Sequence, residues 1–408
     1  MNSLFILFFL FFVLIQFNLI NSNQIRKRRQ VNLEPTLNGT ISFGIVQFIR
    51  FGIIPIGTPS KNFTVAFNLQ SSAFWVIDKD ASFTWTKTSY DNDTSKFSIP
   101  TGKEVVYNDG KSGQMYIDNI TIGEMRLPVM KLVSLTDYPR MPTTFQLTPL
   151  EGVFGLAPPK KMIDPCSGSP LVSIMSVVDH PIVTITQSGV SVGGPDLGKL
   201  TFGAENYDDC EGKYDYVPLA EEGQWSVKIL SVAVNKTKLK AKLSPMLKIM
   251  DQALYMYGPK AQLDELAEML GAVVPEDVGD FYLLNQTACD NMDKMPTITI
   301  RFGEEGKDTS KAVLKPNQYM EVSPIGECRL LFMTNEVMQY DNDYWIMGQQ
   351  FLLNRCVSVH FRKHTMGFAE RREIKEIDDQ NENNNDNLNI KEVENKVEDI
   401  RIRQFIGA

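Results

Sequence analysis

Two polar residues occupy comparable places in the two halves of the sequence. Asn68 follows the apolar run "FTVAF", and Asp251 follows "LKIM". An apolar pair and a glycine come later in each half, at residues 153–155 and 346–348. Only Asp251 could act as a general base, because a carboxamide does not titrate at useful pH. The repetition indicates two related lobes, each presenting one such loop.

Histidine and cysteine side chains form no metal-binding pattern. His180, His360 and His364 have no partner at the spacing that is typical of zinc ligands. We therefore expect no zinc ion and no cofactor. The net charge of −8 over 408 residues also argues against nucleic-acid binding, which favours clustered lysine and arginine.

The elements that must position these residues are predicted to be mainly strands. Short runs rich in Val, Ile, Thr and Phe, broken by turn residues, extend from about residue 41 to residue 370. Residues 103–123 are typical of a long hairpin with Asn108, Asp109 and Gly110 at its tip. Residues 259–272 predict one of the few helices, which ends at Gly271.

Both ends of the chain depart from this pattern. The apolar residues 4–20 indicate a signal peptide within residues 1–22, followed by a short polar and basic segment at residues 23–41. Its "RKRR" cluster, Arg26 to Arg29, suits either a solvated patch or a processing site, and it could also favour a membrane anchor. Residues 370–408 are rich in Asn and charge and are expected to be mostly disordered.

Export is the better interpretation of the N-terminal run. No second apolar run is long enough to span a bilayer, so we expect a secreted, extracellular glycoprotein with no membrane contact after signal removal. The six candidate glycosylation sites are Asn38, Asn62, Asn92, Asn119, Asn235 and Asn285.

Several segments, in the same order, resemble the pepsin family of aspartic peptidases. "FNLQSSAFWV" at 67–76 is similar to the family's F-D-T-G-S-S-x-L-W-V, and "EGVFGLAPP" at 151–159 to its D-G-[IV]-[LM]-G-L-A. "VVYNDGKSG" at 105–113 resembles the flap hairpin that closes over substrate. "WIMGQQFLL" at 345–353 is similar to the W-I-L-G-D-x-F-[IL]-R ending. The likeness covers about residues 42–369.

This resemblance implies an all-β (mostly β) bilobal fold of the pepsin-like acid protease type. Two pseudo-symmetric β lobes, at residues 42–205 and 206–369, would enclose a central cleft. The implied disulfides are Cys289–Cys328 and, as in some relatives, Cys210–Cys356. Cys166 is then left over, and it is expected to be buried or to pair with another chain. The implied cleft and flap residues are Ser71, Trp75, Tyr107 and Gly110.

The family's catalytic residues are not intact here. In the family, two aspartates in D-T-G triplets share one proton and hold a water between them. The first triplet is Asn68-Leu69-Gln70 in this chain, so an amide replaces the first aspartate. Counting back from Gly258 and Pro259 without a gap places Met250 on the second aspartate, whereas one deletion would place Asp251 there. Both alternatives remain open.

We therefore expect a catalytically inactive relative, a pseudoprotease, whose cleft binds a peptide, a protein or an apolar ligand. One alternative is a weakly active aspartic endopeptidase in which Asp251 activates water and Asn68 orients it. Another is a structural or immunomodulatory secreted glycoprotein. The sequence makes no prediction of the ligand's identity or of the oligomeric state.

Overall fold

The computed structural model describes residues 39–46, 49–81, 88–141, 145, 148–158, 169–189, 197–243, 246–277, 281–353 and 355–372. Up to Arg371 these residues belong to one compact unit. The expected signal peptide, the basic cluster, Asn38, Cys166 and the tail from residue 373 lie outside the described residues. Within the described ranges, no helix is both long and apolar enough to cross a membrane.

The first half of the fold is built from strands and one helix. In chain order these are β1 (Gly39–Val46), β2 (Ile49–Ile56), β3 (Lys61–Asn68), β4 (Phe74–Ile77), β5 (Ile99–Val106), β6 (Ser112–Ile122), β7 (Met125–Asp137), β8 (Gly152–Gly155), α3 (Pro170–Val177), β9 (Ile182–Gln187) and β10 (Gly198–Phe202).

The second half continues in the same style with shorter strands and several short helices. Its elements are β11 (Cys210–Pro218), β12 (Ser226–Val234), β13 (Thr237–Lys238), β14 (Met246–Ile249), β15 (Met256–Gly258), α4 (Lys260–Leu270), α5 (Gln286–Asp290), β16 (Ile298–Gly303), β17 (Thr309–Leu314), α6 (Pro316–Tyr319), β18 (Met320–Val322), β19 (Cys328–Leu330), β20 (Phe332–Thr334), β21 (Tyr344–Met347), α7 (Gln349–Leu352), β22 (Arg355–His360) and β23 (Thr365–Arg371), with 3₁₀ helices at Met292–Lys294 and Asn335–Met338. The predicted mostly-β class is confirmed.

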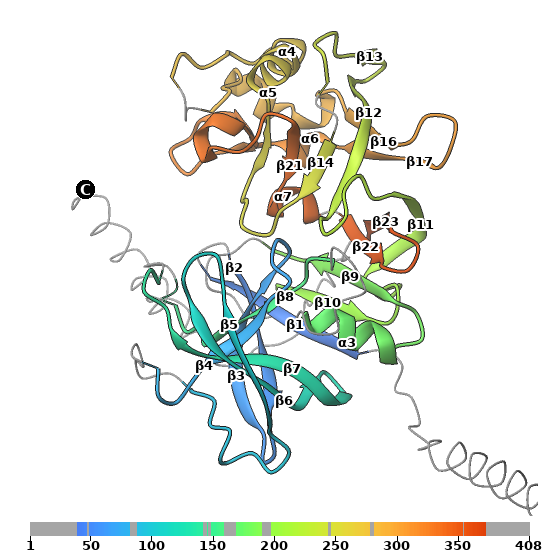
Figure 1. Cartoon of the computed structure of the whole chain (residues 1–408). Coiled ribbons are helices and arrows are strands. Elements are labelled where there is room, and N and C mark those ends of the chain that lie inside the picture. Colours follow the sequence, from blue (N-terminus) through green and yellow to red (C-terminus); the bar gives the residue numbers. More distant parts are fainter. Residues whose placement is uncertain are drawn as a thin grey trace, which may run out of the picture. The chain divides into compact units, whose positions relative to one another are not determined.

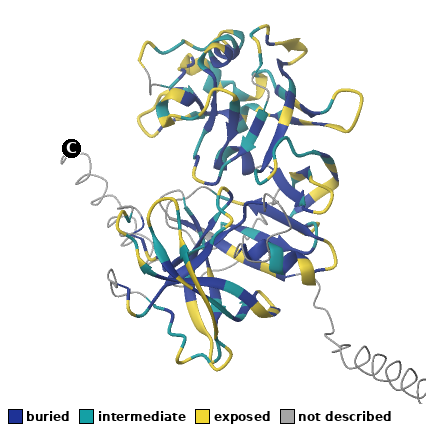
Figure 2. Cartoon of the chain, in the orientation of Figure 1, coloured by how far each residue is buried: buried dark blue, intermediate teal, exposed yellow. Residues whose placement is uncertain are grey.

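Strands from the two halves share one large sheet. Its 13 strands run in the order β11-β23-β22-β9-β10-β1-β2-β3-β8-β4-β7-β6-β5, so late strands lie beside early ones (Figure 1). An eight-stranded sheet, β17-β16-β12-β14-β21-β15-β20 with β13 beside β12, belongs to the second half, and β18 pairs with β19. Figure 2 shows buried positions along these sheets and exposed positions at many of the turns between strands.

Alternating burial explains why the apolar runs form strands. On β2 the buried positions are Arg50, Gly52, Ile54 and Ile56, with less buried residues between them. This period of two places one face of the strand on the core. The side chains on that face, one of them charged, are therefore removed from water by the strand geometry itself.

The predicted helix and hairpin are both present. The helix α4 spans Lys260–Leu270, a little shorter than predicted, and it ends at Gly271 because φ is +76° there, which glycine tolerates. The hairpin of β5 and β6 turns at residues 107–111, where the N–H of Gly110 donates to the carbonyl of Tyr107 at 2.9 Å. Gly110 again has a positive φ, +86°.

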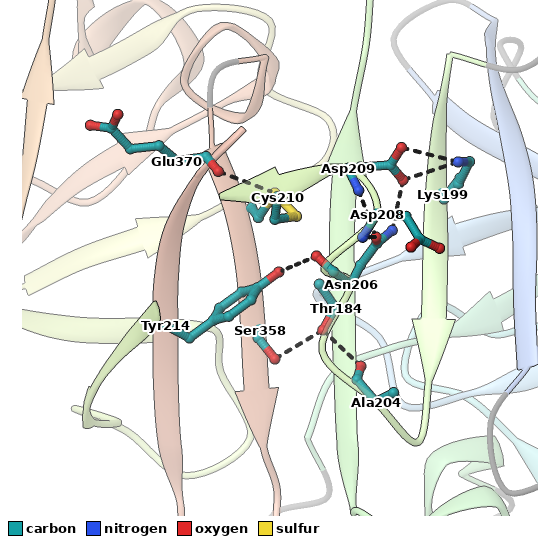
Figure 3. The surroundings of a disulfide bond; sticks show 11 residues. Thr184, Lys199, Ala204, Asn206, Asp208, Asp209, Cys210, Tyr214, Ser358 and Glu370 are labelled. Carbon is teal, nitrogen blue, oxygen red and sulfur yellow. Dashed lines mark hydrogen bonds and ion pairs between the residues drawn. A yellow bond between two sulfur atoms is a disulfide. The ribbon is translucent and has the colours of Figure 1, made fainter. Parts of the chain in front are cut away.

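Two disulfides cross-link the chain, one within the shared sheet and one within the second half. Cys210 on β11 is bonded to Cys356 on β22, and Cys289 on α5 is bonded to Cys328 on β19, the pairs that the family resemblance implied. Cys210 and Cys356 are fully buried. Figure 3 shows Cys210 among polar side chains of the shared sheet, including Tyr214, whose hydroxyl donates to the carbonyl of Asn206 at 3.2 Å.

Candidate functional site

The first candidate loop begins where β3 ends. Asn68 is the last residue of β3 and lies opposite Gly155 of the parallel strand β8. Its carbonyl accepts a hydrogen bond from the N–H of Leu156 at 2.7 Å. Its side-chain Oδ1 accepts from the N–H of Gln70 at 2.8 Å, which closes an Asx turn. The side-chain oxygen of Asn68 is therefore engaged within its own loop.

Gly155 allows that loop to lie directly on β8. A Cβ on Gly155 would stand 2.4 Å from the carbonyl oxygen of Ser71 and 2.6 Å from that of Ala73. Hydrogen bonds fix the approach, because the N–H of Gly155 donates to Ala73 at 2.8 Å and that of Ala157 donates to Ser71 at 2.9 Å. Only a residue without a side chain fits there.

The second loop repeats this geometry. It follows β14, and the N–H of Met250 donates to the carbonyl of Met347 at 3.1 Å. A Cβ on Gly348 would stand 2.2 Å from the carbonyl oxygen of Ala253 and 2.3 Å from that of Tyr255. Gly348 thus does for this loop what Gly155 does for the first.

Strand register decides which residue of the second loop is the counterpart of Asn68. Asn68 is opposite Gly155, whereas Ile249 is opposite Met347, so the position opposite Gly348 belongs to Met250. The strands after the loops agree. Phe74 is opposite Phe154 and Met256 is opposite Met347, and each lies six residues beyond its loop position (74 − 68 and 256 − 250). Met250 is therefore the counterpart of Asn68.

This register separates the two alternatives that the sequence left open. Asp251 is the counterpart of Leu69, the middle residue of the first triplet, and not of Asn68. The expectation that Asp251 could stand at the second catalytic position is not supported by the register. The ungapped count from Gly258 and Pro259 gives the same residue, because both loops have the same length between their paired strands.

Asp251 is nevertheless a buried carboxyl group in the second loop. It is 1% exposed, and that burial raises its pKa to about 6, while the charge of Arg50 and the backbone N–H groups of Asp251 and Leu69 oppose the rise. Neither carboxylate oxygen makes a hydrogen bond of ordinary geometry to any group in the described part of the chain. Sequence reasoning did not single out Arg50.

Side chains join the two loops to each other. Nε2 of Gln70 donates to the carbonyl of Ile249 at 3.1 Å. The indole N–H of Trp225 donates to Leu156 at 2.8 Å, and the carbonyl of Trp225 accepts from the N–H of Ile249 at 2.9 Å. Leu69, 2% exposed, packs in the apolar core. Amide and apolar contacts thus hold the two loops together.

The β5–β6 hairpin carries two of the remaining predicted residues, Tyr107 and Gly110, and Trp75 lies on β4. Tyr107 packs in one cluster with the buried Trp75, whose ring lies 5.9 Å from that of Tyr138. Nζ of Lys111 lies 4.7 Å above the Tyr107 ring and pairs with Asp109. Burial raises the pKa of Tyr107 well above its ordinary value, so its hydroxyl stays protonated.

The other predicted positions are local features. Ser71 accepts a hydrogen bond at Oγ from the N–H of Ala73 at 3.1 Å. Of the sequon residues, Asn62, Asn235 and Asn285 are exposed, and Asn92 and Asn119 are half-buried.

An apolar cluster packs against Met250. It contains the buried Tyr257, Met333 and Ile346 and the half-buried Tyr255 and Tyr340. The two register-equivalent loop positions, Asn68 and Met250, therefore present an amide and a thioether, neither of which can exchange a proton at useful pH. What the surrounding groups offer instead is aromatic and apolar contact area.

Comparison with known proteins gives a consistent family assignment. The family model for eukaryotic aspartyl proteases matches residues 50–371. The chain is 25% identical to renin of Ovis aries over 331 residues, covering 78% of this chain and 79% of that protein. It is 26% identical to cathepsin D of Dictyostelium discoideum over 333 residues (78% and 82%) and 24% identical to cathepsin E-B of Xenopus laevis over 336 residues (79% and 78%).

Proposed function

The chain belongs to the eukaryotic aspartyl protease family, and from that premise we propose that it is a secreted member that binds a ligand without cleaving peptide bonds. The observation that carries the proposal is the pair Asn68 and Met250 at the two register-equivalent loop positions. General acid–base catalysis by this family needs two carboxylates whose close charges divide one proton between them. An amide and a thioether have no proton to divide.

The proposed ligand is an extended peptide, or a protein segment, with aromatic or apolar side chains. Tyr107 and Tyr138 offer apolar area on the flap side, and Tyr255 and Tyr340 on the side of Met250. Aromatic residues bury much surface at little cost in side-chain entropy and are frequent at binding sites. Strand-type contacts beneath a hairpin would supply the main-chain hydrogen bonds.

Weak endopeptidase activity through Asp251 is the second candidate, and the structure disfavours it. A general base must come within hydrogen-bond reach of the attacking water. Asp251 is 1% exposed and is the counterpart of Leu69 behind the loop surface. A role as a structural or immunomodulatory glycoprotein remains the third candidate, and the exposed sequon residues Asn62, Asn235 and Asn285 are compatible with it.

The test compares the protein with a variant whose triplets are restored. The protein, secreted from eukaryotic cells, is incubated with a complex peptide mixture from pH 3 to pH 7, and new peptide termini are scored by mass spectrometry with and without pepstatin. The control carries N68D, L69T, Q70G, M250D, D251T and Q252G. We expect no new termini from the natural sequence and pepstatin-sensitive cleavage from a folded control.

Binding is measured on the same material. Peptides retained by the immobilised protein are eluted and sequenced, and an eluted peptide is titrated back by calorimetry. A saturable complex with uncleaved peptide supports the proposal. Pepstatin-sensitive cleavage by the natural sequence that disappears in Asp251→Ala would instead establish the second candidate.

A further inference from the structure

Arg50 and Asp251 are buried charged side chains that the proposed binding function does not use. Each is 1% exposed. Arg50 lies on the core face of β2, and Asp251 lies in the loop after β14. Nη2 of Arg50 donates to Oε1 of Gln187 at 2.6 Å, and its guanidinium lies 5.6 Å from the centre of the Phe43 ring. The two opposite charges thus come from different halves of the chain.

Arg50 and Asp251 do not satisfy each other's hydrogen-bonding groups. Among the described groups, no direct ion pair joins Arg50 to Asp251, and Nε and Nη1 of Arg50 and both carboxylate oxygens of Asp251 lack a hydrogen bond of ordinary geometry. The groups that oppose the rise in the pKa of Asp251 are the guanidinium of Arg50 and the backbone N–H groups of Asp251 and Leu69, and the charge of Asp251 in turn raises the pKa of Tyr340. Arg50 attracts the ionised carboxylate through the interior but does not donate to it.

Burial of this kind favours the neutral carboxylic acid. An ionised carboxylate in a dry site loses its hydration, and only direct donors or a close cation restore it. When the loops separate and water reaches the side chain, the carboxylate regains that hydration. The packed junction therefore holds a proton on Asp251 more tightly than a loosened junction does. By linkage, a falling pH must favour the packed junction.

We propose that Asp251 is a proton-operated latch: under mildly acidic conditions it takes up a proton, and the loop at residues 68–71 then packs firmly on the loop at residues 249–252. This latch goes beyond the proposed binding function, because it concerns the junction itself and needs no ligand. One consequence does rest on that function: a peptide held beside these loops would bind more tightly in acid.

The contacts around Asp251 explain how the latch reaches both loops. The side chain of Gln349 donates from Nε2 to the carbonyl of Asp251 at 3.1 Å, which fixes the second loop to α7. The side chain of Gln70 donates to Ile249 at 3.1 Å, one residue before Met250. A change in the packing of Asp251 should therefore move the backbone that carries Asn68 and Met250.

Hydrogen exchange with mass spectrometry tests the latch in the full chain without ligand. Protection factors, corrected for intrinsic exchange, are followed from pH 4 to pH 7.5 in peptides that cover residues 65–73 and 246–256. Asp251→Asn mimics the protonated side chain and cannot titrate. Asp290→Asn removes an exposed carboxylate of the same half as a matched control. Peptides from β6 report on global opening.

The expected result is specific to the two loops. In the wild type and in Asp290→Asn, their protection should rise as the pH falls through about 6, by up to about 100-fold, because each pKa unit between packed and loosened states is worth a factor of ten. In Asp251→Asn the loops should be protected at every pH. Wild-type protection that is flat or falls in acid overturns the latch, and so does a rise that Asp251→Asn retains. Both results leave the binding proposal standing.

Discussion

Replacement of Asp251 by Asn should remove one identifiable part of the pH dependence of global stability. The folded protein raises the pKa of Asp251 from its ordinary 3.8 to about 6, chiefly through burial. That gap corresponds to roughly 3 kcal/mol of free energy of unfolding. The folded state binds the extra proton, so this contribution is fully present below about pH 4 and is lost as the pH rises through 6. Asparagine has nearly the same shape and contributes no such slope.

The assay is denaturant unfolding of the oxidised protein from pH 3.5 to pH 7.5, followed by tryptophan fluorescence. The informative quantity is the wild-type free energy of unfolding minus that of Asp251→Asn, because all other carboxylates cancel in it. This difference should grow by about 3 kcal/mol as the pH falls across the range. A constant difference, or one that shrinks in acid, would refute the reasoning. Asp290→Asn, which removes an exposed carboxylate, is measured alongside as the control for the loss of one charge.

Three further changes probe the same framework. Arg50→Gln removes the charge that opposes proton uptake, so the pH midpoint of the stability profile should move above 6, and a midpoint that stays or falls contradicts the assignment. Gly348→Ala places a Cβ 2.2 Å from a backbone oxygen and should lower the free energy of unfolding by about 1–3 kcal/mol or more, which a lower Tm would report. An unchanged Tm would show that the loop moves to make room for the methyl group. Loss of the Cys210–Cys356 bridge, which spans 146 residues, should lower the free energy of unfolding by about 2–5 kcal/mol, and the double serine variant should retain full stability only if the bridge does not form.

Local sequence patterns predicted the elements whose signals are local. Gly271 marked the end of α4 because a left-handed residue there favours glycine, and Gly110 marked the hairpin tip for the same reason. The mostly-β class followed from short β-branched and aromatic runs with turn residues between them. These features depend on a few neighbouring residues, so a single sequence contains them.

The choice between the two candidate residues of the second loop depends on the pairing of distant strands, which no local pattern contains. Whether Met250 or Asp251 is the counterpart of Asn68 is set by β14 lying parallel to β21, whose residues come nearly a hundred positions later. Arg50 was missed for a related reason: a lone arginine in a strand is usually exposed. The alternation of β2, with Gly52, Ile54 and Ile56 on one face, was the available signal that Arg50 points into the core.

The shared sheet has a consequence for how the chain is made. Thr184 of β9 is opposite Ser358 of β22, so the edge of β9 finds its neighbour only when almost all described residues have been synthesised. Until then, the nascent first half carries an open row of backbone donors and acceptors, which invites pairing with other chains. The strands of this sheet therefore do not pair in the order in which they are synthesised. Either half expressed alone should aggregate more readily than the whole.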